Sequence, residues 1–183
     1  MSTRFDRRHR RIVRMVAAVA AVAGLALPAS ASANLESGTS ALCTVRLPSV
    51  EITPPFEPLV LTASSGTITS HGPTGSVSCS GEIGGAAVTG TGTAAIHYTR
   101  HGNCAAHVST NGRVIWKIPT EHGDKELAGS LQVTRIGLNV LAHLEFADAR
   151  GDFVGALYPR KGDCLLTPLS QVGVVVTGYL GAR

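Results

Sequence analysis

The chain has 183 residues, only 15% of them charged, and its formal charge of +4 is unevenly distributed. Residues 1–33 hold six arginines and one acid, whereas residues 34–183 hold 10 basic and 11 acidic residues and carry a formal charge of −1. A body this apolar is not disordered. It also lacks the basic surface that binds nucleic acids or anionic membranes, and its seven scattered aromatic rings offer no evident platform for stacking bases.

Residues 1–33 have the three parts of a secretory signal peptide. The arginines between Arg4 and Arg14 form a basic start, and the apolar run over residues 15–27 is too short to cross ~30 Å of hydrocarbon. The small residues at 31–33 suit a signal peptidase, although cleavage after Ala31 and an uncleaved anchor are alternatives. Paired arginines add twin-arginine export as a further alternative. We expect a secreted or envelope-associated protein with no membrane span in its mature part.

All four cysteines lie in the mature part of the chain, at Cys43, Cys79, Cys104 and Cys164. An even number of cysteines in an exported chain predicts two disulfides. Three pairings are possible and the spacing does not distinguish them, although we favour Cys43–Cys79 with Cys104–Cys164. No C-x-x-C pair occurs, so the cysteines do not predict a zinc site.

The first half of the mature part predicts short strands separated by proline and glycine. A first strand is expected over residues 43–47, after which the prolines between 48 and 58 forbid a helix and favour extended chain. The Gly- and Thr-rich stretch 81–93 is expected to contain turns or bulges. Other short strands are expected over 59–61, 66–70 and 77–80.

A hairpin is expected where Gly102-Asn103 separates strands over 95–100 and 105–109. The dipeptide Asn111-Gly112 predicts a second turn, which would precede a strand over 114–118.

The clearest alternation of apolar and polar residues lies between 138 and 146. Every second residue there is apolar, which predicts a strand whose inward residues are Leu138, Val140, Ala142, Leu144 and Phe146. A helix over 138–149 is the alternative, because leucine, alanine and glutamate favour helices.

The remaining segments continue the pattern of short strands. Turns are expected at Arg150-Gly151-Asp152 and Lys161-Gly162-Asp163, and a last strand over 172–180. About ten short strands with no amphipathic helix predict an all-β fold. We expect an antiparallel β-sandwich, or alternatively a β-barrel, in one disulfide-stapled domain over residues 34–183.

His97, His101 and His107 are close in sequence, which raises the question of a metal site. On one strand, His97 and His101 would lie ~13 Å apart at ~3.3 Å per residue, whereas zinc-bound nitrogens lie ~2.0–2.1 Å from the metal. Across the expected hairpin, residue 107 would pair with residue 98, so that His107 points to the other face. We therefore expect no metal site, and no change in melting temperature when a chelator is added.

No motif predicts catalytic or cofactor-binding residues. The chain has no G-x-S-x-G motif and no phosphate-binding glycine loop, and the acids Glu145, Asp148 and Asp152 lack the spacing of a calcium loop. The tripeptide at 150–152 matches a cell-adhesion motif, but its residues are also good turn formers, and we interpret it as a turn.

Several segments resemble a group of small secreted all-β proteins of actinobacteria that have no assigned activity. They are the basic, Ala/Val-rich leader, the Gly/Thr/Ser-rich mature part, and the motifs at 78–81 (SCSG), 134–137 (TRIG) and 153–159, which precede Cys164. The resemblance implies export and a β fold, and it assigns no functional residue. Secreted subtilisin-inhibitor-type proteins of the same bacteria also have two disulfides, which keeps an inhibitor role open.

The leading hypothesis is a non-enzymatic protein that binds an unknown partner or has a structural role. One alternative is a small secreted hydrolase with a site assembled from distant Ser, His or acidic residues, which requires a concave pocket with coupled His and carboxylate groups. Another is a protease inhibitor with a rigid loop, for instance the proline-rich stretch 48–58. A binding module should instead show an exposed apolar patch.

Overall fold

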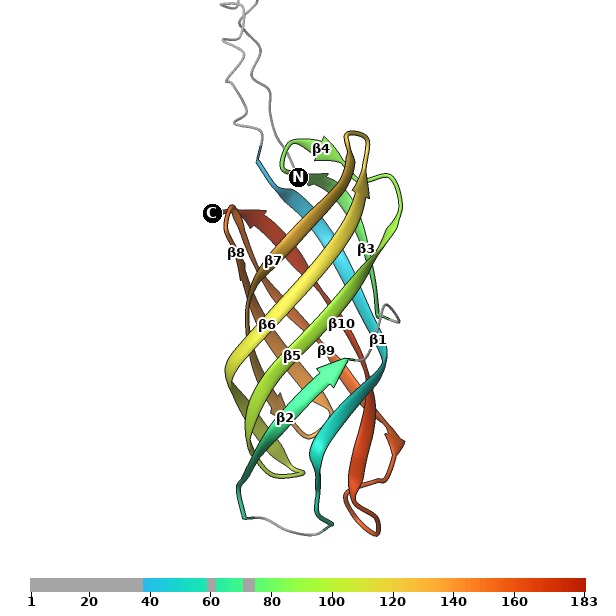
Figure 1. The fold of residues 1–183 in the computed structure, drawn as a ribbon, viewed down its shortest axis with the longest axis vertical. Coiled ribbons are helices and arrows are strands. Elements are labelled where there is room, and N and C mark those ends of the chain that lie inside the picture. Colours follow the sequence, from blue (N-terminus) through green and yellow to red (C-terminus); the bar gives the residue numbers. More distant parts are fainter. Residues whose placement is uncertain (1–37, 59–61, 71–74) are drawn as a thin grey trace, which may run out of the picture. The chain divides into compact units, whose positions relative to one another are not determined.

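The computed structural model describes residues 38–58, 62–70 and 75–183, and these residues form ten strands and no helix (Figure 1). The expected signal peptide at 1–33 and the expected strand at 59–61 lie outside the described residues. In the part of the chain that is described, no helix is long and apolar enough to cross a membrane. The strands are β1 (Ser40–Phe56), β2 (Ser64–Ser70), β3 (Gly75–Ile83), β4 (Ala86–Ala87), β5 (Thr91–Gly102), β6 (Ala106–Thr120), β7 (Gly123–Ile136), β8 (Asn139–Phe146), β9 (Ala149–Lys161) and β10 (Leu169–Ala182).

The strands form one antiparallel sheet that closes on itself. Its order is β10-β9-β8-β7-β6-β5-β2-β1-β3-β4, and β1 also pairs with β10 along most of its length, from Ser40↔Gly181 to Phe56↔Leu169 (Figure 1). Two short strands, β2 and β3, both lie between β1 and β5. Each of them pairs with β1 on one side and with β5 on the other. The expected all-β antiparallel fold of about ten strands is confirmed. Opposite parts of the closed sheet face each other across a shared interior, as the layers of a sandwich or the walls of a barrel do.

Period-two alternation decides which side chains enter this interior. Along β8, residues Val140, Ala142, Leu144 and Phe146 are buried, and the residues between them are exposed or half-buried, so the strand prediction for this segment is confirmed over the helix alternative. Leu138 is not an inward residue as expected. It is 57% exposed in the two-residue turn between β7 and β8, where Gly137 has a φ of 60°.

Two predicted turns are wrong because the strands continue through them. Asn111-Gly112 lies inside β6, where a side chain on residue 112 would come within 2.0 Å of the Leu131 carbonyl oxygen. Glycine therefore permits close approach of β7 there instead of forming a turn. Residues 150–152 lie inside β9, paired with both β8 and β10, and the chain turns instead at residues 147–148.

Both disulfides have the pairing that we favoured. Cys43–Cys79 joins residues that face each other on β1 and β3, and Cys104–Cys164 joins the β5–β6 turn to the β9–β10 loop. No cysteine is left free. The second bridge therefore holds together two connections at the same end of the closed sheet, where the turn between β7 and β8 also lies.

Candidate functional site

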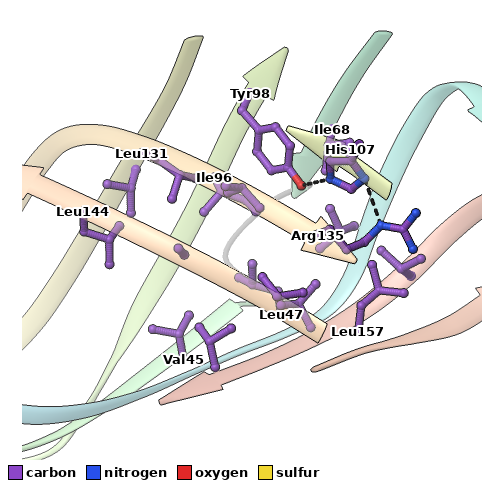
Figure 2. A pocket seen from close by; sticks show the side chains of 18 of the residues that line it. Val45, Leu47, Ile68, Ile96, Tyr98, His107, Leu131, Arg135, Leu144 and Leu157 are labelled. Atoms are coloured by element: carbon purple, nitrogen blue, oxygen red, sulfur yellow. Dashed lines mark hydrogen bonds between the residues drawn. The ribbon is translucent and has the colours of Figure 1, made fainter. Parts of the chain in front are cut away.

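A cavity of about 50 Å³ lies inside the closed sheet (Figure 2). Its 19 lining residues come from β1, β2 and β5 to β10, and all but three of them are apolar. The exceptions are Tyr98, His107 and Arg135, which Figure 2 shows in a row on the side of the cavity away from Leu131 and Leu144. The apolar walls are built from valine, leucine, isoleucine, alanine and Trp116 side chains, which alternation along each strand turns inward.

Neighbouring strands position the three polar side chains. Tyr98 is on β5, His107 on β6 and Arg135 on β7, and all three are at most 5% exposed. The His107 Nε2 atom lies 3.1 Å from the Tyr98 hydroxyl, and Arg135 Nε donates a hydrogen bond of 2.9 Å to His107 Nδ1. A guanidinium nitrogen can only donate, so Nδ1 must accept, and the ring proton of the neutral imidazole lies on Nε2. His107 therefore donates to Tyr98.

Burial keeps this row in a single protonation state. Burial, reinforced by the charges of Arg135 and Arg100, lowers the pKa of His107 to about 3. Burial also raises the pKa of Tyr98, and the two arginines oppose that rise only in part. At neutral pH the imidazole and the phenol are both uncharged, so the hydrogen-bond directions derived above are fixed.

Arg135 hydrogen-bonds to the backbone of two turns at this end of the sheet. Its Nη1 atom donates to the Gly137 carbonyl oxygen at 2.7 Å, and its Nη2 atom donates to the carbonyl oxygens of Asn103 and Cys104. The turns between β5 and β6 and between β7 and β8 are thereby tied to one buried side chain. These bonds satisfy carbonyl groups that strand pairing leaves without donors.

A second buried arginine, Arg100, packs on the same Phe56 ring that contacts His107. Arg100 is fully buried, and its guanidinium carbon lies 3.8 Å from the centre of the Phe56 ring, which in turn stacks on His107. It donates to the Pro54 carbonyl oxygen at 2.7 Å and to the Ser64 hydroxyl at 3.1 Å. Among the described residues, neither Arg100 nor Arg135 pairs with a carboxylate. Burial lowers the pKa of both guanidinium groups.

Trp116 also lines the cavity. Its indole packs against Phe146 at 5.3 Å and against Phe153 at 5.6 Å between ring centres. The two phenylalanine rings lie over Gly129 and Gly178, where a Cβ atom would come within 2.8 Å and 2.7 Å of the ring carbons. The Trp116 indole N–H is buried and has no acceptor among the described residues.

The histidines predicted not to bind metal lie on opposite faces of the sheet. His97 and His101 point outward and hydrogen-bond to Thr69 and Ser65, whereas His107 is buried. The expected pairing partner of His107 is wrong. Residue 107 faces Gly102 rather than residue 98, because the turn takes in residues 103–105. The described residues contain no group of three or more His, Cys, Asp or Glu side chains placed to hold a metal ion.

An outward-facing cluster joins a histidine to two acids. His143 Nδ1 lies 2.7 Å from an Asp152 oxygen, and its Nε2 atom lies 3.9 Å from a Glu145 oxygen. Both ring nitrogens therefore face carboxylates, and neither is hydrogen-bonded to a serine or threonine hydroxyl in the described structure. A Ser-His-Asp triad needs a nucleophile on the second ring nitrogen, so this cluster is not such a triad.

The proline-rich stretch proposed as an inhibitory loop is mostly strand, because residues 48–56 belong to β1. One connection that does carry exposed apolar residues is the β9–β10 loop, where Leu166 is 84% exposed. The Asp163 side chain accepts hydrogen bonds from the backbone N–H groups of Leu165, Leu166 and Thr167. These bonds lower the pKa of Asp163 and coil the loop, so it lacks the extended backbone that would pair with a protease cleft.

Exposed apolar residues are also present on the outer face of the sheet. Leu141 on β8 and Val154 on β9 face each other there, and both are more than half exposed. Ile136 and Leu138 lie nearby at the β7–β8 turn. Exposed apolar residues of this kind mark a binding module where they form one continuous patch.

The alternation between residues 138 and 146 correctly predicted the inward side chains Val140, Ala142 and Leu144, which line the cavity, but no sequence pattern was used to predict its three polar residues. Arg135 was noted only as part of the TRIG motif, although it continues the inward series of Leu131 and Val133 on β7. A charged residue at an inward position of an alternating strand is the signal that could have marked it. Arg100 gives the same signal, because it continues the inward series of Ala94 and Tyr98 on β5. His107 gives none, because the irregular pairing on β6 between residues 109 and 111 separates it from the inward residues Val114 and Trp116. No protein family, no curated protein and no solved structure matches the chain.

Proposed function

We propose that the protein is an exported, non-enzymatic binding protein that holds a small, mainly apolar ligand inside its closed sheet. The observation that carries this proposal is the cavity of about 50 Å³, lined almost wholly by apolar side chains and bordered at one side by a polar row. This volume is several times the ~10–15 Å³ that one water molecule needs. It is far below the ~300–1,000 Å³ of pockets for drug-sized ligands, so the ligand is a small molecule.

The energetics of the interior support a ligand-binding role. An empty apolar cavity of this volume lowers stability by about 1 kcal/mol, at roughly 24 cal/mol per Å³. Water recovers little of that loss along the apolar walls, because it makes no hydrogen bonds there. An apolar ligand restores the missing packing contacts and removes no hydrogen bond from the walls.

The leader and the disulfides support export. Residues 1–33 have the pattern of a secretory signal, and both cysteine pairs are oxidised, as is usual outside the cytosol. The resemblance to small secreted all-β proteins of actinobacteria points the same way.

The test is a titration of the purified, disulfide-bonded protein with xenon and with short hydrocarbons, followed by ¹H–¹⁵N NMR. We expect saturable shifts at the amides of cavity residues. Ala142→Val adds two methyl groups inside the cavity and should abolish these shifts, whereas Ala156→Val, on the exposed face of β9, should leave them unchanged.

Two results would contradict the proposal. One is the absence of saturable shifts at any cavity residue. The other is turnover of ester, glycoside or peptide substrates by the purified protein that His143→Gln abolishes, because that would transfer the function to the outward cluster.

A further inference from the structure

The hydrogen-bond directions at the polar side of the cavity define the chemistry of its ligand. The Tyr98 hydroxyl receives the His107 Nε2 proton, so its own proton must be donated elsewhere. Among the described residues no acceptor for that proton is present, and Tyr98 is only 5% exposed. A buried donor without an acceptor is unfavourable unless a bound molecule supplies one.

A second donor at the cavity wall is also unsatisfied. Trp116 lines the cavity, is 1% exposed, and has an indole N–H with no acceptor in the described structure. The other lining side chains, apart from His107 and Arg135, contain no polar atoms. The cavity wall therefore offers hydrogen-bond donors that lack partners and no side-chain acceptor that is free for a ligand donor.

The charge of the ligand follows from the donors that remain. Arg135 uses Nε on His107, Nη1 on Gly137, and Nη2 on two carbonyl oxygens, so four of its five N–H groups are engaged. A buried carboxylate has two charged oxygens that each need several donors, and at most three remain here: the Tyr98 hydroxyl, the Trp116 indole N–H and one N–H of Arg135. A neutral oxygen needs one donor, and the positive charge of Arg135 orients its dipole toward Tyr98.

We propose that the cavity binds a small neutral molecule whose single carbonyl oxygen accepts a hydrogen bond from Tyr98, with its aliphatic part against the valine and leucine walls. This inference rests on the proposed binding function and specifies its ligand. His107 and Arg135 act as positioning residues, because together they direct the Tyr98 proton into the cavity. The volume limits the ligand to about four water-sized groups.

Four probes of four non-hydrogen atoms each separate the relevant properties. Propanone carries a carbonyl oxygen, 2-methylpropene replaces that oxygen by carbon at the same shape, 2-propanol adds a donor, and acetate adds a charge. In ¹H–¹⁵N NMR titrations we expect propanone to bind about tenfold more tightly than 2-methylpropene, the size of one neutral hydrogen bond. 2-Propanol should bind more weakly than propanone because its proton meets no free side-chain acceptor. Acetate should bind at least tenfold more weakly than propanone.

Tyr98→Phe removes only the hydroxyl and should reduce the preference for propanone over 2-methylpropene to about one. Tyr179→Phe is the matched control, because Tyr179 is exposed on β10, and it should keep the preference. If Tyr98→Phe does not fold, the four probes on the unmodified protein decide the question.

The outcomes distinguish the two proposals. Equal binding of propanone and 2-methylpropene overturns the carbonyl assignment and leaves interior binding intact, as does tighter binding of acetate than of propanone. An unchanged preference in Tyr98→Phe overturns the role of Tyr98. A lack of saturable shifts with all four probes overturns the proposed function as well.

Discussion

The two halves of the interior are built from the same strands and are filled differently. In the half near the β8–β9 turn, Trp116, Phe146 and Phe153 pack against one another and onto glycines of the neighbouring strands. In the other half the walls are mostly valine and leucine, and the centre contains a cavity bordered by the Tyr98–His107–Arg135 row.

The difference shows how side-chain length decides whether a closed sheet has a solid centre. Aromatic rings reach across the interior when a glycine on the adjacent strand leaves room beneath them, as Gly178 does for Phe153. Branched aliphatic side chains are too short to meet in the middle, and the space that they leave is available to a ligand. Trp116 belongs to both halves, because it contacts the phenylalanines and lines the cavity.

The largest expected effect is loss of the aromatic cluster. Trp116→Ala should lower the free energy of unfolding by about 3–5 kcal/mol, because it removes a fully buried ring and enlarges the cavity. Ile115→Ala, at the exposed neighbouring position, should change it by less than about 0.5 kcal/mol. Urea unfolding measures both values. A loss below 1 kcal/mol for Trp116→Ala would mean that the aromatic half is not the better packed one.

The polar row should make stability depend on pH. The pKa of His107 is lowered to about 3 in the folded protein, against about 6.5 in an unfolded chain, so between these values the unfolded chain binds the extra proton. Stability is therefore complete above about pH 6.5, and it should fall by roughly 3 kcal/mol between pH 6.5 and pH 4. Urea unfolding across this range measures the decline.

A matched variant assigns that decline to His107. In His107→Gln the amide oxygen can accept from Arg135 and the amide nitrogen can donate to Tyr98, but the side chain does not titrate. The variant should lose most of the slope. A slope that is the same in both proteins would show that other groups cause the acid sensitivity.

Adding one methylene should have opposite effects inside and outside the cavity. Val133 lines the cavity, so Val133→Ile places the added methylene there and should raise the free energy of unfolding by about 0.5–1 kcal/mol. Val77→Ile, at a fully buried position that does not line the cavity, should destabilise it by about 1 kcal/mol through overpacking. Thermal unfolding compares the pair. Destabilisation of similar size in both would indicate that the cavity walls do not accept additional volume.

The smallest effect is expected at the exposed β9–β10 loop. Leu166→Ser should change the free energy of unfolding by less than about 0.5 kcal/mol, because the side chain is 84% exposed and packs on nothing that the change would uncover. A loss of more than 1 kcal/mol in urea unfolding would show that this leucine contributes to folding.

Patterns of neighbouring residues, namely apolar alternation and turn-forming dipeptides, predicted most of the strands and some of the turns. Alternation identified β8, and glycine at residue 137 permits the tight turn that precedes it. The turn predicted at Asn111-Gly112 was wrong, because glycine in this dipeptide can also allow two strands to approach closely. Whether a glycine forms a turn or permits close strand packing depends on the position of the neighbouring strand. The residues adjacent to the glycine in sequence do not indicate that position.

The amino-acid sequence alone reveals a basic N-terminal segment, a nearly neutral apolar body, four cysteines and strands of period two. These properties depend on residues that are adjacent along the chain. The folded structure is needed to show that the sheet closes, which residues face one another inside it, and that Tyr98, His107 and Arg135 meet at a cavity. Those features depend on strand register across long separations, and a shift of one residue would turn every inward side chain outward.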